Sequence, residues 1–515
     1  MKYPIGIQTF EKIREKDFVY IDKTDFIYDL THGGTYYFLS RPRRFGKSLL
    51  VSTLESYFKG KKELFEGLKI SKLENEWIEY PVFHLDMNQA VFNKEHELED
   101  VLNNAISGWE DIYGTRPTET TITLRFNGVI QRAAEQTGRN VVILVDEYDK
   151  PLLQTLNNQE LGDKYREQLK SFYSCLKTQD KYIKFAFVTG VTKFSKVSIF
   201  SDLNNLADLS LISRYASICG ITEDEIKTYF DEEIQSFADE QDISKDECYQ
   251  QLKEYYDGYH FSTRSQGVYN PFSLLNALNY KEFRDYWFET GTPTYLVELL
   301  KKANYRISDL TRLKIRPSQL DNLDINDKEP LSAIYQSGYL TIKHYDKVFD
   351  VFELGYPNKE VEKGFTEFLL PYYLPKGKAE SNNFLIDFVT SIQNGEPNRF
   401  MNLLDAFMAG GNYQIAGDAE LYFQNAVYLI FKMMGFYVQA EYPTSDGRMD
   451  LIVQAADFIY IFEFKIDKSA EDAIKQIENK GYAHQFNADK RKLFKIGVNF
   501  SSENRKIEGW KVVER

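Results

Sequence analysis

The sequence of 515 residues has few cysteines and no long apolar run, and each of these absences excludes a class of protein. Its three cysteines, Cys175, Cys219 and Cys248, are scattered and odd in number, which excludes a zinc cluster built on CxxC pairs and agrees with a reducing compartment. The longest apolar runs, such as 141–145 and 426–431, fall far short of the roughly 18 residues that span a bilayer. The first residues also lack the apolar core of a signal peptide. We therefore expect a cytoplasmic protein with no membrane partner.

Histidine and proline are scarce as well. The six histidines form no pair with the spacing of metal ligands, and no Ser/His/Asp arrangement is visible from spacing. With only 14 prolines, and with 43% hydrophobic and 15% aromatic residues, the chain has enough apolar surface to fold throughout, so extensive disorder is excluded. A folded chain of this length is expected to form roughly three domains.

Negative charge dominates, and the net charge of −14 argues against a protein that coats nucleic acid without specificity. The charge is unevenly distributed along the chain. Residues 1–70 hold 13 Lys and Arg against 9 Asp and Glu, and residues 421–515 hold 14 against 13, so the excess acid lies between them. The overall acidity therefore does not exclude a polyanion as partner of either terminal region.

The first half of the chain alternates short apolar runs with longer segments of helical spacing. Buried strands that alternate with helices are typical of a parallel sheet, so we expect an α/β fold. The expected strands are 35–39, 81–87, 141–145 and 184–188, and the clearest helices are 48–58 and 97–109.

The pattern changes near residue 220, where Thr222 and Glu225 have the spacing of a helix capping box. We expect a first α/β domain over 1–220, a helical lid over 221–345, a connector with short helices over 346–411 and a second α/β domain over 412–515. The second domain is expected to contain a helix at 419–434, strands at 449–453 and 458–465, a helix at 469–484 and a strand at 493–500.

A phosphate-binding loop is indicated at Ser40–Ser48, which follows an apolar strand and opens a helical segment. Backbone N–H groups at a helix N-terminus point at an anion, Lys47 would reach the β- and γ-phosphates, and the Ser48 hydroxyl would sit on Mg²⁺. Arg41 replaces the usual first glycine, which weakens the match and leaves a basic turn before a surface helix as the alternative. The residues expected to bind ATP are Arg44, Phe45, Gly46, Lys47, Ser48 and Leu49.

The second half of such a site is indicated by the apolar strand that ends in Asp146 and Glu147. Asp146 would hold Mg²⁺, and Glu147 would polarise the attacking water, unless the two acids merely cap the next turn. The additional strand at 81–87 and the glutamate favour the ATPase division that includes AAA+ proteins. Thr189, at the end of the next strand, is expected either to sense the γ-phosphate or to end the strand in a plain turn.

Several segments together resemble the predicted AAA-ATPase-like family of bacterial and archaeal proteins. The family commonly has Arg at the first loop position and carries a C-terminal PD-(D/E)xK nuclease-like domain, so the resemblance implies both. The segments are Pro4–Ile7, Tyr20–Thr24, Leu39–Ser48, Asp146–Pro151, Ile199–Asn205 and Tyr256–Tyr259.

The C-terminal region resembles the PD-(D/E)xK nuclease core, with Asp450 as the first acid and Glu463 with Lys465 as the second part. Two adjacent strands would present Asp450 and Glu463 to a divalent metal, and residues two apart on one strand point to the same face. Lys465 would orient or deprotonate the attacking water and counter the charge developing on phosphate. The alternative is that these charges are solvated edges of a small sheet.

Three further side chains belong to this hypothesis. Glu420 matches the place of an extra acidic metal ligand in the superfamily, with Glu441 as its competitor, and Gln476 matches a polar site position on the following helix. The metal ligands expected in the two domains are Ser48, Asp146, Glu420, Asp450 and Glu463, with Mg²⁺ as the ion and Mn²⁺ as its substitute at the nuclease-like site.

The sequence therefore predicts an ATPase whose C-terminal domain cleaves nucleic acid, with DNA in preference to RNA. The alternative is a nucleotide-dependent switch or scaffold with a nuclease-like binding module that does not cleave. A local patch such as Lys490, Arg491, Lys492 and Lys495 would have to hold the nucleic acid, although it reads more readily as a solvated face. Self-assembly stays open, and Arg214 is a guess for an arginine donated to a neighbouring copy.

Overall fold

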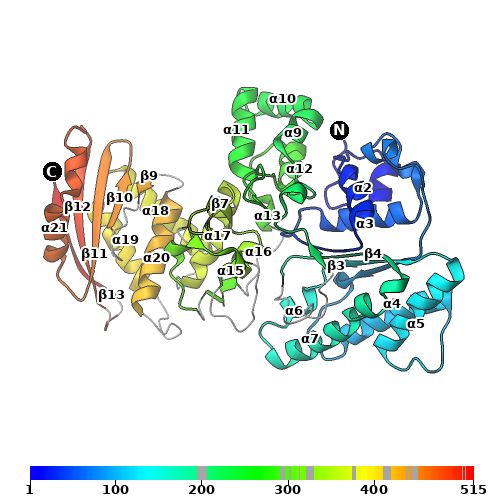
Figure 1. The fold of residues 1–515 in the computed structure, drawn as a ribbon. Coiled ribbons are helices and arrows are strands. Elements are labelled where there is room, and N and C mark those ends of the chain that lie inside the picture. The colour runs from blue at the N-terminus through cyan, green and yellow to red at the C-terminus, as the bar shows by residue number, and fades with distance from the viewer. Residues whose placement is uncertain are drawn as a thin grey trace. The chain divides into compact units, whose positions relative to one another are not determined.

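The computed structural model describes most of the chain. No helix among the described residues is both long and apolar enough to cross a lipid bilayer. The chain forms two compact units, Met1–Gly291 with Thr311–Val361 and Thr292–Leu310 with Glu362–Arg515 (Figure 1). The described residues are 1–193, 206–289, 296–297, 299–300, 303–311, 314–320, 330–373, 378–409, 419–435, 439–441, 450–501, 503–504 and 506–515.

A parallel five-stranded sheet with the order β2-β3-β4-β1-β5 organises the first unit. Four strands lie where the apolar runs predicted them, and only the two-residue β5 was not expected. In this order β4 lies between β1, which leads into the phosphate loop, and β3, which ends in the two acids. The loop and the acids therefore lie at the same edge of the sheet, one strand apart. The strands are β1 (Tyr36–Ser40), β2 (Val82–Asp86), β3 (Val141–Asp146), β4 (Ile183–Gly190) and β5 (Ala207–Asp208).

Helices cover both faces of this sheet. Figure 1 shows α2 (Thr24–Gly33) and α3 (Lys47–Phe58) on one face, and α4 (Glu97–Tyr113), α5 (Ile122–Thr137) and α7 (Gln159–Tyr173) on the other. Burial of the apolar side of α3 against the strands fixes the direction of its N-terminus. The remaining short helices are α1 (Phe10–Glu15), α6 (Lys150–Gln154) and α8 (Cys175–Thr178).

A helical region follows, and it begins with the predicted capping box of Thr222 and Glu225. Its own core of buried residues includes Phe230, Ile234 and Phe237. The region differs from the expected lid after residue 313, because β6 (Lys314–Ile315), β8 (Val351–Gly355) and β7 (Thr341–Asp346) form an antiparallel sheet. The helices are α9 (Glu223–Tyr229), α10 (Asp231–Glu240), α11 (Lys245–Tyr256), α12 (Pro271–Tyr280), α13 (Tyr286–Glu289), α15 (Pro317–Leu320) and α16 (Leu331–Gln336).

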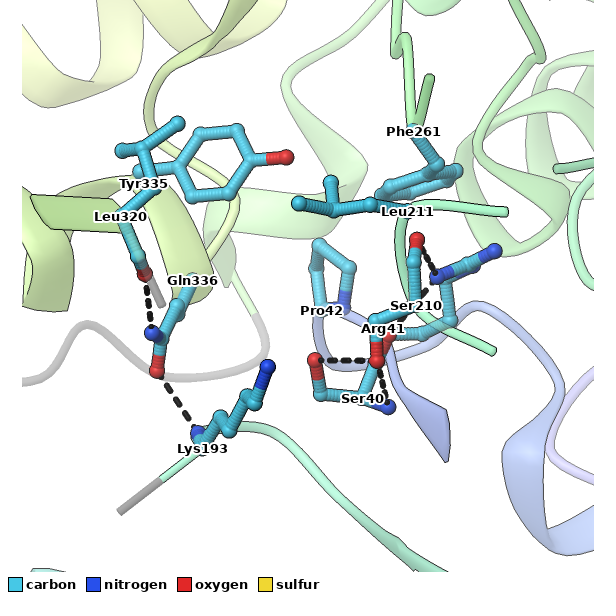
Figure 2. Close-up of a pocket in the computed structure, with 10 residues that line it drawn as sticks. All are labelled: Ser40, Arg41, Pro42, Lys193, Ser210, Leu211, Phe261, Leu320, Tyr335 and Gln336. Atoms are coloured by element: carbon cyan, nitrogen blue, oxygen red, sulfur yellow. Dashed lines mark hydrogen bonds between the residues drawn. The ribbon is translucent and has the colours of Figure 1, made fainter. Parts of the chain in front are cut away.

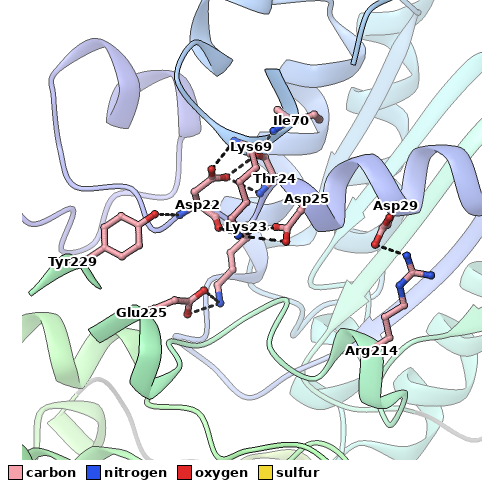
Figure 3. A network of polar contacts seen from close by, with 10 residues as sticks. All are labelled: Asp22, Lys23, Thr24, Asp25, Asp29, Lys69, Ile70, Arg214, Glu225 and Tyr229. Atoms are coloured by element: carbon pink, nitrogen blue, oxygen red, sulfur yellow. Dashed lines mark hydrogen bonds and ion pairs between the residues drawn. The ribbon is translucent and has the colours of Figure 1, made fainter. Parts of the chain in front are cut away.

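A polar network joins the N-terminal segment to this helical region (Figure 3). The Asp22 carboxylate accepts hydrogen bonds from the Thr24 amide at 2.9 Å and from the Lys69 amide at 2.7 Å. The half-buried Lys23 ammonium pairs at 2.7 Å with Glu225, the capping glutamate of α9. The segment Tyr20–Thr24, one of the family-like motifs, therefore links the N-terminal part of unit 1 to the helical region.

The second unit contains a mixed five-stranded sheet with the order β13-β12-β11-β10-β9. The predicted helix at 419–434 and the predicted strands agree closely with the structure, whereas β9 and β13 were not expected. The segment 346–411 differs from a connector with short helices, since it holds β8 and three helices of 13 to 16 residues. The elements are α17 (Lys359–Tyr373), α18 (Lys378–Gln393), α19 (Pro397–Ala409), α20 (Ala419–Met434), β9 (Gln439–Glu441), β10 (Asp450–Gln454), β11 (Phe458–Ile466), α21 (Ala470–Asn479), β12 (Lys492–Ser501) and β13 (Lys506–Glu514).

Strand β11 has two different faces because its side chains alternate. Ile459 and Ile461 pack in a core with Ile474 and Ile477 of α21. On the opposite face, Phe462 contacts aromatic rings of α19 and α20. The alternation places residues 463 and 465 on the face that α21 covers.

Candidate active sites

The phosphate loop lies between β1 and α3, as the sequence predicts. Gly46 caps α3 with φ +93°, a left-handed conformation that glycine adopts without steric cost. Lys47 is buried, and its ammonium donates to the Pro42 carbonyl at 3.3 Å. The ammonium thus curls back over the loop, next to the free N–H groups at the start of α3 that would receive an anion.

The acidic end of β3 lies beside this loop. Asp146 is 3% exposed, and burial raises its pKa to about 6, with Glu147 adding to the rise and the Ser48 hydrogen bond and Lys47 opposing it. Its Oδ1 atom is buried and accepts no hydrogen bond from the described residues. A buried carboxylate oxygen without a donor, next to a serine hydroxyl, fits a divalent cation with oxygen ligands.

Glu147 approaches the same place from the other side. Its Oε1 atom lies 3.2 Å from the Lys47 ammonium, so the loop lysine and the expected general base form an ion pair. The backbone of Glu147 has φ +54°, which costs roughly 1 kcal/mol for a residue with a Cβ atom. Strained positions of this kind concentrate at functional sites.

The structure places the predicted Thr189 at the end of β4. Thr189 is fully buried, and its hydroxyl donates to the Leu39 carbonyl at 2.8 Å. This contact agrees with a structural role, while sensing of the γ-phosphate stays a prediction.

The sequence analysis missed Asp149. It accepts hydrogen bonds from the amide and hydroxyl of Thr192, each at 2.6 Å. A Cβ atom on Gly190 would lie 2.4 Å from the Asp149 carboxylate, so this position needs glycine. Asp149 was visible only as part of the Asp146–Pro151 motif.

Other predicted residues of the first site occupy different surroundings. Phe45 is buried, Leu49 is half-buried in the first turn of α3, and the Arg44 guanidinium lies over the Phe272 ring. The guess for Arg214 is weakened because this side chain pairs with Asp29 (Figure 3). The family-like segment at 199–205 lies outside the described residues.

The second candidate site is on β11 and α21. Glu463 is fully buried and Lys465 is 8% exposed, and the two are joined at 2.8 Å. The Lys465 ammonium also donates to the Gln476 amide oxygen on α21. The Oε2 atom of Glu463 is buried and has no hydrogen-bond donor among the described residues. Glu463, Lys465 and Gln476 therefore lie together, as predicted, and the orphaned oxygen fits a metal ligand.

The other expected ligands of this site are described only by their backbone. Asp450 pairs directly with Glu463 in the register of β10 and β11, Glu420 lies at the start of α20, and Glu441 ends β9. Their side chains lie outside the described part. Among the side chains that are described, no three or more His, Cys, Asp or Glu residues form a group that could hold a metal ion.

The basic cluster of the second unit is largely neutralised. Arg491 pairs with Asp489 at 2.7 Å, Lys492 with Glu514 at 2.7 Å, and Lys495 with Glu478 at 3.3 Å. Such exposed ion pairs are weak. Even so, three of the four basic residues at 490, 491, 492 and 495 already have an acidic partner and offer little free positive charge to a phosphate backbone. The reading of this cluster as a solvated face is favoured.

Comparisons with known proteins agree with this division of the chain. Residues 4–200 match the family model described as predicted AAA-ATPase, and residues 418–510 match that of the PD-(D/E)XK nuclease superfamily. An uncharacterized protein in the vnfD 5′ region of Azotobacter chroococcum mcd 1 is 37% identical to the chain over 99% of its length and 98% of that relative. No solved structure matches the chain.

Proposed function

The chain belongs to the predicted AAA-ATPase-like family with a C-terminal PD-(D/E)XK nuclease superfamily domain, and we propose that it hydrolyses ATP in the first unit and cleaves nucleic acid, DNA in preference to RNA, with the second. The observation that supports the ATPase is the meeting of Lys47, Ser48, Asp146 and Glu147 at the ends of β1 and β3. The three free, buried cysteines support a reducing, cytoplasmic location. Assembly of several copies also stays a proposal.

In this proposal each residue of the first site has a separate task. Lys47 exchanges its ion pair with Glu147 for the β- and γ-phosphates. Ser48 and Asp146 would hold Mg²⁺, which would neutralise charge on the phosphate oxygens. Glu147 is then released and takes a proton from the attacking water, whose oxygen bonds to the γ-phosphorus. The bond from that phosphorus to the bridging oxygen breaks, and ADP leaves. Thr189 is proposed to sense the γ-phosphate through the strand end.

Calorimetric titration of the full chain with Mg-ATP tests this assignment. We expect Lys47→Ala to lose measurable binding, because the ammonium is the charge aimed at the phosphates, while the far-ultraviolet circular dichroism spectrum stays that of the unaltered protein. Unaltered affinity in the variant would refute the site.

The nuclease proposal depends on the buried group of Glu463, Lys465 and Gln476. Asp450, Glu463 and Glu420 would hold Mg²⁺ or Mn²⁺, which would polarise the scissile phosphate. Lys465, held by Glu463 and Gln476, orients the attacking water and counters the charge that develops on the phosphate oxygens. To deprotonate that water, Lys465 would first have to give up its own proton, which the ion pair with Glu463 opposes.

The test is incubation of the purified chain with plasmid, single-stranded DNA and RNA, with Mg²⁺, Mn²⁺ or Ca²⁺, and with or without ATP. We expect cleavage with the first two ions and none with Ca²⁺, which occupies oxygen sites without the same geometry. Absence of cleavage under every condition would leave the second candidate.

That second candidate is a nucleotide-dependent switch or scaffold whose C-terminal domain binds without cleaving. The ion pairs of Arg491, Lys492 and Lys495 favour it, because they leave no evident basic track among the described residues of the second unit. A gel-shift measurement that also records the amount of intact nucleic acid separates the two candidates. The scaffold should shift the nucleic acid without any metal-dependent loss of it, whereas the nuclease should degrade it.

A further inference from the structure

One residue of the phosphate loop has no role in the proposed hydrolysis. Arg41 occupies the first loop position, where glycine is usual, and only 1% of it is exposed. A fully buried arginine needs partners for its charge and its donors. The partners of Arg41 therefore indicate what this arginine does at a position where glycine is usual.

Three backbone carbonyls and one aromatic ring surround the Arg41 guanidinium. It donates to the carbonyls of Ser40 and Ser210 at 2.9 Å and of Tyr215 at 3.1 Å. Its carbon atom lies 4.0 Å from the centre of the Phe261 ring, an approach typical of a cation–π contact. Figure 2 shows Arg41 beside Ser210 and below Phe261.

Arg41 forms no ion pair among the described residues, so carbonyl dipoles and the ring are its direct partners, and the nearby Asp208 also favours its charged form. Burial lowers its pKa to about 10, which still leaves it charged at neutral pH. The backbone amide of Arg41 also donates to the Gly190 carbonyl at the end of β4. The residue is thus fixed at both its backbone and its side chain.

The rest of the loop touches the same region. The Phe45 ring packs edge-on against Tyr259 at 4.7 Å and against Phe261 at 5.4 Å. The Trp287 indole donates to the Arg43 carbonyl at 3.1 Å. The family-like segments around residues 41–45 and 256–259 therefore meet in space, although more than 200 positions separate them.

We propose that Arg41 is a positioning residue, which uses Phe261 and the carbonyls of Ser210 and Tyr215 to hold the phosphate loop in the shape that binds ATP. The inference rests on the proposed ATPase function. In an ordinary loop a glycine lets the backbone wrap the phosphates; here the side chain of Arg41 and the segments 210–215 and 259–261 set that shape. The helical region is consequently part of the nucleotide site without touching the nucleotide.

The decisive variant is Arg41→Gly, because it restores the ordinary loop pattern. We expect ATP affinity to fall at least tenfold, measured by calorimetry well below the unfolding temperature. Arg41→Lys, which keeps the charge but cannot reach all three carbonyls, is expected to recover part of the affinity. Unaltered or tighter binding by Arg41→Gly would overturn the inference.

Phe261→Leu tests the same positioning role from outside the loop. It replaces Arg41→Gly as the test if that variant does not fold. Loss of the cation–π contact is expected to weaken ATP binding roughly threefold. In the double variant Arg41→Lys/Phe261→Leu the loss caused by Phe261→Leu should be smaller than in the unaltered protein, because an ammonium stacks on the ring less well than the planar guanidinium. Additive losses would overturn the coupling between ring and loop.

Two matched controls separate positioning from general stability. Arg132→Lys alters another buried arginine, on α5, and Phe237→Leu alters another buried ring, on α10. Both should lower the unfolding temperature and leave ATP affinity unchanged; equal losses of affinity in the controls would show a merely structural effect. If the unaltered protein bound no ATP, the proposed function would fail together with the inference, whereas normal affinity in Arg41→Gly defeats the inference alone.

Discussion

The two candidate sites use the same pair of groups in different ways. Lys47 and Glu147 are 100 positions apart in the sequence and meet because the strand order brings the ends of β1 and β3 together. Lys465 and Glu463 are neighbours on one face of β11 and meet because side chains alternate along a strand. The first pair depends on topology, and the second only on local geometry.

Burial differs as well. The Glu147 side chain is 18% exposed, whereas that of Glu463 is fully buried. Both lysines are buried, so the carboxylates make the difference: Glu147 can turn to solvent when a phosphate replaces it, whereas the enclosed Glu463 holds its lysine in place. The difference suggests that the first lysine moves during turnover and the second is preorganised, and the following predictions test that contrast.

The largest expected effect is on cleavage. Asp450→Ala or Lys465→Ala should abolish phosphodiester cleavage, because each removes a metal ligand or the cation beside the attacking water. ATP hydrolysis should stay close to normal, since the first unit has its own core. The paired assays are phosphate release and plasmid nicking on the same preparations. Cleavage that survives in both variants would remove the nuclease assignment.

A smaller loss is expected at the first site. Glu147→Gln should bind ATP but hydrolyse it roughly 10²-fold more slowly, because the amide cannot accept the proton of the attacking water. Without the ion pair, Lys47 is also free for phosphate, so ATP affinity should rise modestly. Single-turnover phosphate release and calorimetry measure the two quantities. Normal turnover would mean that another residue serves as the base.

The contrast between the sites also explains which of their residues the sequence alone could predict. The resemblance to the nuclease core and strand periodicity predict Glu463 beside Lys465, and two short motifs predict Lys47 near Asp146, so the structure places these pairs as expected while their roles stay predictions. The role of Arg41 was not predicted, because its partners Phe261 and Tyr215 come from distant segments that no local pattern connects. Strands β7 and β13 were missed for a related reason. Charged residues interrupt both, so neither has the apolar run that marks a buried strand.

Stability should reveal the difference in burial. Lys465→Met leaves Glu463 buried without its cation and should destabilise the second unit by about 3 kcal/mol, whereas Lys47→Met should cost the first unit only about 1 kcal/mol. Trp510 lies in β13 of the second unit, so a variant that keeps only this tryptophan reports its unfolding in denaturant. As a control, Lys465→Met/Glu463→Gln should recover part of the loss. Equal losses at the two sites would contradict the contrast.

The smallest expected effect is a proton released when Mg-ATP binds. In the nucleotide-free protein, burial raises the pKa of Asp146 to about 6, and Asp86 and Glu147 add to the rise while Ser48 and Lys47 oppose it. Protonation therefore stabilises the empty fold, an effect fully present below about pH 4 and lost as the pH rises through 6.

A cation at Asp146 requires the ionised carboxylate, so binding at pH 6 should expel about half a proton more from the unaltered protein than from Asp146→Asn. At pH 8 the carboxylate is already ionised and the difference should vanish. Calorimetry in two buffers of different ionisation enthalpy measures the proton count, and the comparison with Asp146→Asn cancels protons released by the nucleotide. Burial also raises the pKa of Asp149 to about 6, and the comparison with Asp146→Asn cancels a proton that Asp149 releases in both proteins. A difference that is the same at both pH values would mean that Asp146 does not take up the metal.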